Sequence, residues 1–183
     1  RFQEETRQLM TTKKKNIGFN DRAVGTLVGL ACGDALGAAY EFGGPLPETQ
    51  EIGMVGGGAF GWEPGEWTDD TSMAIPVLQA LARGKSLSEE ATQDEIVSAW
   101  SYWAEAAKDV GIQTRAVLGS LSALTAASAR ASAEAIHQKT SRSGGNGSLM
   151  RTTPVALGTL ESRDQTAANA RVISRLTHFD ENA

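Results

Sequence analysis

Apolar residues recur along most of this chain at spacings of three and four residues, which is typical of helices that face a core. No segment shows the period-two alternation of a half-buried strand. The clearest helical pattern follows the capping-box sequence Thr92-Gln93-Asp94-Glu95, and its apolar positions are Ile96, Val97, Trp100 and Trp103. We interpret both tryptophans as core residues. The pattern predicts an all-α fold.

Helices and loops alternate along the chain. Residues 43–66 are rich in glycine and hold three prolines, so we expect a long loop there, of the kind that is usually functional. Pro76 should kink or divide the helix that follows, which Gly84 should end. The helix beginning near Asn20 or Asp21 is expected to end near Tyr40. Further helices are expected over 68–82, 111–130, 131–138, 149–160 and 166–176.

Composition favours one domain over residues 20–183, preceded by a flexible N-terminal tail over residues 1–19. The 183 residues are 40% hydrophobic, which is enough for a core. A net charge of −5 argues against nucleic-acid binding. The most apolar stretch, residues 24–39, is too short to span a membrane. Cys32 is the only cysteine, which excludes an internal disulfide and fits a reducing cytoplasm.

Adjacent carboxylates, Asp69 and Asp70, follow Thr68 at a predicted helix start. Thr68 is a plausible N-cap, and acids in a first turn favour the positive end of the helix dipole. A simple cap is the commoner use of these residues. A metal site is the alternative, because successive side chains on a helix point about 100° apart and can serve different surroundings.

The first expected helix carries a second signal. Glycines recur at every fourth position from Gly25 to Gly37, and each interior glycine costs about 1 kcal/mol against alanine. Close packing of another helix explains most of such a stripe. Asp34 and Glu41 lie seven residues apart, hence on one helical face. This pair suits a polar ligand or a cation, or else it is a solvated acidic face.

A glycine-rich loop, Ser143 to Ser148, precedes another helical pattern. Glycines let backbone N–H groups approach a ligand, and a helix start favours an anion. The loop is neither a P-loop nor a Rossmann turn, because it lacks the Gly-Lys-Ser/Thr ending and follows no strand. A phosphate cradle and a flexible interhelical loop are equally consistent with it.

Three segments together resemble the ADP-ribosylglycohydrolase family, of the dinitrogenase-reductase-activating type. They are Gly33–Glu41, Pro64–Met73 and Gly145–Arg151, in the family's order, and the resemblance extends over residues 20–183. It implies a compact, orthogonal all-α domain with a binuclear Mg²⁺ centre, or Mn²⁺ in its place. It also implies an enzyme that removes ADP-ribose from modified protein side chains.

The resemblance assigns roles by matching position. Thr68, Asp69 and Asp70 would be metal ligands, and Glu41 the mobile catalytic acid near the scissile bond. Asp34 would support the site. Asp109 resembles the aspartate that meets the guanidinium in the arginine-directed branch, and a carboxylate suits that planar group. The ribose and diphosphate would be held by Ser143, Gly145, Asn146, Gly147, Ser148 and His178.

One metal-binding piece of the family is absent. The family has an Asp-x-Asp-Thr segment near its C-terminus, and no Asp-x-Asp follows Asp70 here. We therefore expect this chain to lack the C-terminal part of the fold. A fragment whose remainder is another chain, a split protein with a partner, and a degraded relative all remain open, and the first is favoured. The first two predict a large apolar face that the missing half covers.

The leading hypothesis is thus a metal-dependent hydrolase of the N-glycosidic bond to arginine, complete only with its missing part. The alternative is a noncatalytic ADP-ribose-binding module or pseudoenzyme. A metal-dependent phosphoester hydrolase is a third interpretation, but the chain has only two histidines and no cluster of them. The expected partners are an ADP-ribosylated protein or ADP-ribose, and the missing half.

Overall fold

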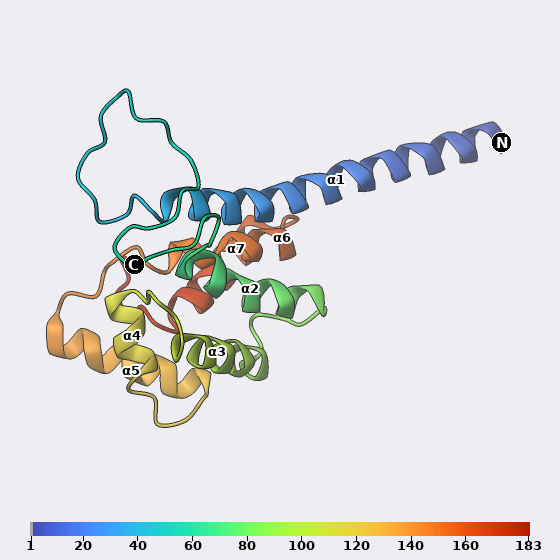
Figure 1. Ribbon diagram of the computed structural model, residues 1–183. Helices are drawn as coiled ribbons and strands as arrows, with labels where there is room; N and C mark the ends of the chain where they lie inside the picture. Colours follow the sequence, from blue (N-terminus) through green and yellow to red (C-terminus); the bar gives the residue numbers. More distant parts are fainter. Residues whose placement is uncertain (1) are drawn as a thin grey trace.

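The described residues form a purely helical architecture, which confirms the all-α prediction. The computed structural model describes the backbone of residues 2–183 and the side chains of residues 18–183 (Figure 1). In this part of the chain the only strand-like pairing is one antiparallel bridge between Gly57 and Trp62. The helices are α1 (Phe2–Gly37), α2 (Asp69–Ala82), α3 (Glu90–Ala104), α4 (Ile112–Leu118), α5 (Ala126–Thr140), the 3-10 helix η1 (Leu149–Arg151), α6 (Thr153–Gly158) and α7 (Arg163–Ser174).

The core lies around α2, which packs against α3, α6 and η1. Met73 and Val77 of α2 are fully buried together with Trp100 of α3 and Ile173 of α7. The Trp100 indole N–H donates to the Met73 carbonyl at 2.9 Å, so the largest core side chain leaves no unpaired donor. Trp103 is partly buried against the same cluster. Trp100 is thus a core residue, as predicted, whereas Trp103 lies at the edge of the core and also lines a cavity.

The predicted start of the first helix is wrong. Asn20 and Asp21 lie inside α1, whose bounds are Phe2–Gly37, so neither caps it. The predicted tail, residues 1–19, lies outside the described side chains except for Gly18 and Phe19, which are helical. In Figure 1, α1 extends well beyond the other helices, and it contacts α2 and α6 near its C-terminal end.

The capping box predicted at Thr92 is also wrong. Helix α3 begins one turn earlier, at Glu90, and Thr92 is buried within it. The Gln93 amide donates to the Leu87 carbonyl at 2.9 Å, and the Asp94 carboxylate accepts from the Ala126 N–H at 2.7 Å. These side chains therefore bond to other segments, and tertiary contacts have overridden a local signal.

Other helix boundaries shift. The expected helix over 111–130 breaks after Leu118, and Thr125 caps α5 by accepting from the Ser128 N–H. The segment 149–160 divides into η1 and α6. Helix α2 is not divided, because it continues through Pro76 to Ala82.

The loop between α1 and α2 is anchored at its start. The Tyr40 hydroxyl donates to the Gly53 carbonyl at 2.9 Å and accepts from the Gly53 N–H at 3.1 Å. At Gly58 the backbone has φ +69°, and a Cβ there would lie 2.9 Å from the Ala39 carbonyl. Only glycine fits such a conformation without strain. These contacts hold the loop against the residues that directly precede Glu41.

The glycine stripe of α1 does not pack against a helix of the described chain. A Cβ added at Gly25, Gly29, Gly33 or Gly37 would meet nothing within 4 Å. The expectation that close helix packing explains these glycines is therefore wrong for the described residues. No described helix is long and apolar enough to cross a membrane.

Candidate active site

Asp34, on the last turn of α1, holds the N-terminus of α2. One carboxylate oxygen accepts from the Thr68 N–H at 3.0 Å and its hydroxyl at 2.7 Å. The other accepts from the Thr71 N–H at 2.9 Å and its hydroxyl at 2.6 Å. Thr68 occupies the N-cap position, but its side chain makes no capping bond. A remote carboxylate thus satisfies the donors that a helix start leaves free.

This arrangement fixes the direction of the two acids that follow. Asp69 is buried, and its carboxylate accepts from the Gly111 N–H at 3.2 Å. Asp70 is half-buried. Because the Thr68 hydroxyl donates to Asp34, its lone pairs stay available to a cation.

Glu41 and Asp109 complete an acidic cluster, which we define as Asp34, Glu41, Asp69, Asp70 and Asp109. The last four have raised pKa values, with burial as the largest cause. Negative neighbours raise the pKa of Asp70 further, to about 6. The pKa of Glu41 rises through burial and then through the nearby charge of Asp109.

Positive charge from the described residues reaches this cluster by longer-range coupling, from Arg151 to Asp69 and from Arg115 to Asp109. Among the described residues, no Lys or Arg forms an ion pair with Glu41, Asp69 or Asp70. The Arg115 charge opposes the rise in the Asp109 pKa without contacting the other acids. One buried and several half-buried carboxylates close together are costly, unless a proton or a metal ion joins them.

The donor set fits a hard divalent ion, in part. Mg²⁺ takes oxygen ligands, keeps several waters and needs few protein carboxylates. Thr68, Asp69 and Asp70 offer one hydroxyl and two carboxylates of that kind. The described residues nevertheless contain no group of three or more acidic, histidine or cysteine side chains already arranged around one point. The cluster therefore supplies some ligands and not a complete shell.

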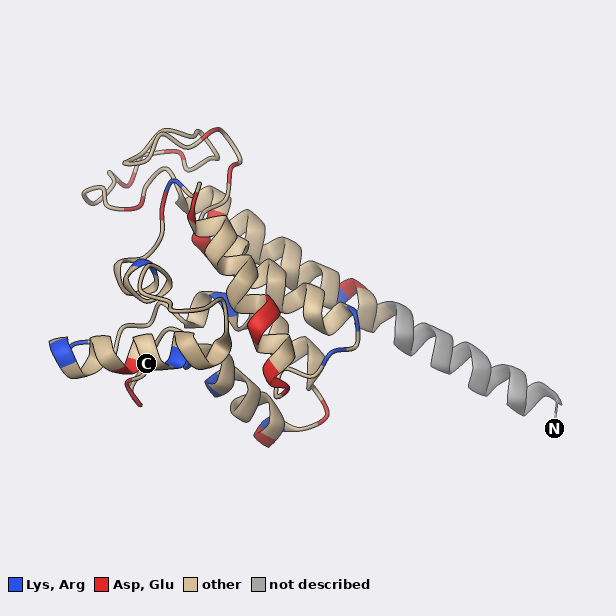
Figure 2. Cartoon of the chain, turned by 90° about the horizontal axis from the view of Figure 1, so that it is seen from below, with Lys and Arg blue, Asp and Glu red and all other residues tan. Residues whose placement is uncertain are grey.

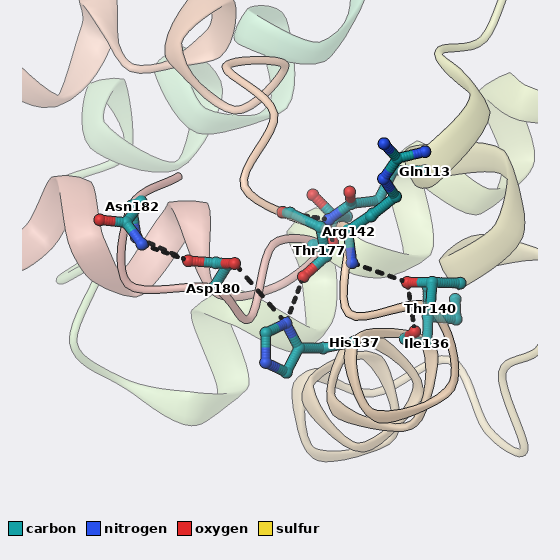
Figure 3. A network of polar contacts seen from close by, with 9 residues as sticks. Gln113, Ile136, His137, Thr140, Arg142, Thr177, Asp180 and Asn182 are labelled. Atoms are coloured by element: carbon teal, nitrogen blue, oxygen red, sulfur yellow. Dashed lines mark hydrogen bonds and ion pairs between the residues drawn. The ribbon is translucent and has the colours of Figure 1, made fainter.

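The glycine loop is anchored at both ends. Ser143 and Ser148 are buried. The Ser143 hydroxyl meets Nδ1 of His137 at 2.5 Å, and the Ser148 hydroxyl accepts from the Ser174 hydroxyl at 2.8 Å. Figure 3 shows His137 between the loop and Asp180, whose carboxylate lies 3.7 Å from the same nitrogen. Both partners share one nitrogen, so this is a structural anchor and not a proton-relay triad.

Between these anchors the loop is open. Gly145 and Asn146 are exposed, and Gly147 is half-exposed. Asn146, Ser148 and His178 line a cavity of about 690 Å³. A Cβ added at Gly147 would lie 3.4 Å from Nε2 of His178, so the loop passes directly over this imidazole. The structure thus brings together four of the residues that the sequence assigned to ADP-ribose.

Arg151 is a residue that the sequence analysis did not single out as functional. It is fully buried, with its guanidinium 4.3 Å from the centre of the Trp100 ring. It donates to the Ile173 carbonyl at 3.2 Å and to the Thr177 hydroxyl at 2.6 Å. Its positive charge lowers the pKa of His178. Burial lowers the pKa of Arg151 itself to about 9, and the nearby charge of Asp69 opposes this shift. In the sequence, the signal that could have found it is an arginine that directly follows the glycine loop within an otherwise uncharged helical pattern.

A second cavity of about 420 Å³ lies beside the acidic cluster. Its lining includes Thr68 and Asp109 together with Trp67 and Tyr102, which are both exposed. Three of the chain's four tryptophans line it. Aromatic faces beside a carboxylate suit a guanidinium group.

Comparisons with known proteins show the family of the chain. The family model described as ADP-ribosylglycohydrolase matches residues 15–183. The chain is 31% identical over 162 residues to the ADP-ribosylarginine hydrolase Tri1 of Serratia proteamaculans, covering 86% of this chain and 42% of that protein. It is 33% identical over 172 residues to the ADP-ribosyl-[dinitrogen reductase] glycohydrolase of Rhodospirillum rubrum, covering 87% and 52%.

A solved structure, titled an ADP-ribosylglycohydrolase-related protein complex, superposes with a TM-score of 0.62 at 30% identity. The match covers 90% of this chain and 52% of that one. The chain thus spans about half the length of these relatives. On the match of the family model over nearly its whole length, the chain belongs to the ADP-ribosylglycohydrolase family.

Proposed function

We propose that this chain forms the N-terminal part of a metal-dependent hydrolase that removes ADP-ribose from modified arginine side chains. The observation that carries the proposal is the acidic cluster, four of whose carboxyl groups have raised pKa values. The arginine-directed relatives support the linkage, since one is named for ADP-ribosylarginine.

Thr68, Asp69 and Asp70 would hold part of a binuclear Mg²⁺ centre, or Mn²⁺ in its place. When bound, such ions orient ribose hydroxyls and lower the pKa of water. They would also neutralise the repulsion among the acids, so the same charge that destabilises the metal-free site would provide its affinity.

Glu41 would handle the proton of the reaction. Water attacks the anomeric carbon of the ribose, the carbon–nitrogen bond breaks, and the guanidine leaves. Glu41 takes one proton from the attacking water and returns it to the departing nitrogen, so charge and atoms balance. A raised pKa brings a carboxyl group nearer to neutral pH and makes both transfers easier.

The modified arginine would enter through the 420 Å³ cavity. Asp109 would pair with the guanidinium in a bidentate manner, and Trp67 would stack against its face. In the 690 Å³ cavity, the glycine loop and His178 would hold the diphosphate of ADP-ribose.

The missing half of the fold would cover α1. Between Arg22 and Asp34 this helix carries no charge (Figure 2). Val24 and Val28 are 59% and 54% exposed, and Cys32 and Leu36 continue the same ridge. The four glycines form an open groove beside it. We infer that the occupant is a polypeptide equivalent to the half of the relatives that this chain does not span, because apolar faces of this length are normally covered.

The reactivity of Cys32, the sole cysteine, tests whether the complementary half covers α1. Cys32 should react readily with a thiol reagent in the chain alone and at least about tenfold more slowly when the complementary half is supplied as a separate polypeptide. Equal reactivity in both cases would contradict the inferred cover. Protection that rises with the concentration of this chain alone would instead identify a second copy as the occupant.

The metal assignment is tested by Mn²⁺ binding, which is measured as the loss of the electron paramagnetic resonance signal of the free ion. Asp69→Ala and Asp70→Ala should each weaken binding at least about tenfold, because each removes one ligand. Asp164→Ala is the matched control, since Asp164 is an exposed acid at the same position of α7 as Asp70 in α2. Equal binding by Asp164→Ala and Asp70→Ala would refute the metal site.

Turnover of ADP-ribosyl-arginine and ADP-ribosyl-serine peptides, measured with the complementary half present, tests the reaction. We expect arginine release only, and its loss in Asp69→Ala and Glu41→Gln. Turnover that both variants retain would refute the assigned roles.

A noncatalytic ADP-ribose-binding module is the second candidate. It is favoured by the incomplete ligand arrangement among the described residues. Saturable ADP-ribose binding without turnover, with the complementary half present, would select this candidate.

A further inference from the structure

His178 can offer either a hydrogen-bond donor or an acceptor to the glycine loop, depending on its tautomer. It is 3% exposed, and its Nδ1 lies 2.7 Å from the Thr177 hydroxyl. Its Nε2 faces Gly147, and no hydrogen bond among the described residues involves that atom. Burial and the Arg151 charge lower the pKa of His178 to about 4, so the ring is neutral at pH 7. A neutral imidazole carries one N–H, and its location decides whether Nε2 donates or accepts.

Arg151 decides the direction of the bond at the other nitrogen. A guanidinium can only donate, so the Thr177 oxygen accepts at its 2.6 Å contact with Arg151. The Thr177 hydroxyl proton then needs its own acceptor. Thr177 is fully buried, and among the described residues His178 Nδ1 is the only acceptor that its hydroxyl contacts. An unpaired buried hydroxyl proton would be costly, so the proton points to Nδ1.

We propose that Arg151 and Thr177 are positioning residues that lock His178 in the tautomer with its proton on Nε2, as a neutral donor to a phosphate oxygen of ADP-ribose bound at the glycine loop. The ligand part of this inference depends on the proposed function. The tautomer part depends only on the three side chains.

The lock matters because a phosphate oxygen has no proton to give at neutral pH. The opposite tautomer would aim a nitrogen lone pair at that oxygen and repel it. The hydrogen bonds from Arg151 to Thr177 and from Thr177 to His178 therefore make Nε2 a donor without placing a second positive charge beside Arg151. The exposed glycines of the loop then leave the N–H free to reach the ligand.

Nitrogen-15 NMR of the imidazole rings tests the lock without any ligand. The chain has only two histidines, so the spectrum holds two ring systems, and His178→Ala assigns them. We expect the wild type and Thr177→Ser to show the Nε2–H form of His178. In Thr177→Val, which removes the hydroxyl, we expect a substantial Nδ1–H population. The Nδ1–H form in the wild type, or no change in Thr177→Val, would overturn the proposal.

Binding of ADP-ribose to the same proteins, with the complementary half present, tests the consequence. Thr177→Val should weaken binding about tenfold, and Thr177→Ser should restore it, because serine keeps the hydroxyl. A merely structural role would change stability without changing the ring signals. Wild-type protein that shows the Nε2–H form but does not bind ADP-ribose would refute the proposed function and leave the lock standing. Equal affinity of both variants, with wild-type binding intact, would refute the donor role.

Discussion

The acidic cluster and the glycine loop handle buried polar groups in opposite ways. Around the loop, the hydroxyls of Ser143, Ser148 and Thr177 each have a protein partner, and Arg151 contacts carbonyls and an aromatic face. In the cluster, only Asp34 has its charge satisfied by several donors. The loop region thus pairs its hydroxyls within the protein, although Nε of Arg151 and Nε2 of His178 have no partner among the described residues. The cluster instead crowds its carboxylates, at a cost that a bound cation would remove.

The contrast teaches where each region's function lies. A network of paired hydroxyls fixes the geometry of the loop, which suits the recognition of a diphosphate. A crowded group of carboxylates stores electrostatic repulsion, which suits metal binding and proton transfer. The predictions below test this difference, from the largest expected effect to the smallest.

Removing the one satisfied acid should have the largest effect. Asp34→Ala leaves the donors of Thr68 and Thr71 without their acceptor, so we expect the free energy of unfolding to fall by about 3 kcal/mol. Urea denaturation followed by circular dichroism measures it. Asp34→Asn keeps an acceptor oxygen and should lose less. A loss below about 1 kcal/mol in Asp34→Ala would show that the hydrogen bonds accepted by Asp34 do not hold α2 in place.

Filling the space above His178 should impair ligand binding. In Gly147→Ala the new methyl group would lie 3.4 Å from Nε2, so we expect ADP-ribose affinity to fall about tenfold, or about 1.4 kcal/mol. Gly44→Ala is the control outside the glycine loop, because a Cβ there meets nothing within 4 Å. Calorimetry compares the two. Equal affinities would place the ligand away from this imidazole.

The pH dependence of stability should report the crowded acids. A raised folded-state pKa means that a carboxyl group favours the folded state while protonated and disfavours it once ionised. Without divalent cations, the free energy of unfolding should therefore fall as pH rises from about 4 through about 6, where Asp70 titrates.

Asp70→Asn should flatten this decline and stabilise the metal-free protein at pH 7 by about 1 kcal/mol, after allowance for solvent screening. Urea denaturation between pH 4 and 8 measures it, with Asp164→Asn as the control. An unchanged dependence of the free energy of unfolding on pH would mean that Asp70 is not repelled by the neighbouring carboxylates. The same variant should lose Mn²⁺ affinity, so stability and function would change in opposite directions.

The smallest effect is expected far from both regions. Glu95 pairs with Arg83 and Lys85 at the surface, with nearly half of its side chain exposed. Glu95→Gln should leave the free energy of unfolding nearly unchanged, because exposed ion pairs are weak. A loss as large as that of Asp34→Ala would show that charge location matters less than we argue.

Much of the fold followed from the sequence because its causes are local. Helical spacing predicted Trp100 and Trp103 as core residues, and the structure confirms Trp100 and shows Trp103 partly buried at the edge of the core. The glycine loop was recognised from the conformational freedom of its residues. The helix start at Asp69 was predicted because its residue types favour a first turn.

The sequence by itself determined which residue types stand in short segments: the acids after Thr68, the glycines before Leu149, and the apolar periods between them. Only the tertiary structure decided which of these meet. Asp34 caps a helix 34 residues away, Asp94 caps α5, and Arg151 orients a histidine through Thr177. Such contacts depend on how helices cross in space, and no local spacing encodes that crossing.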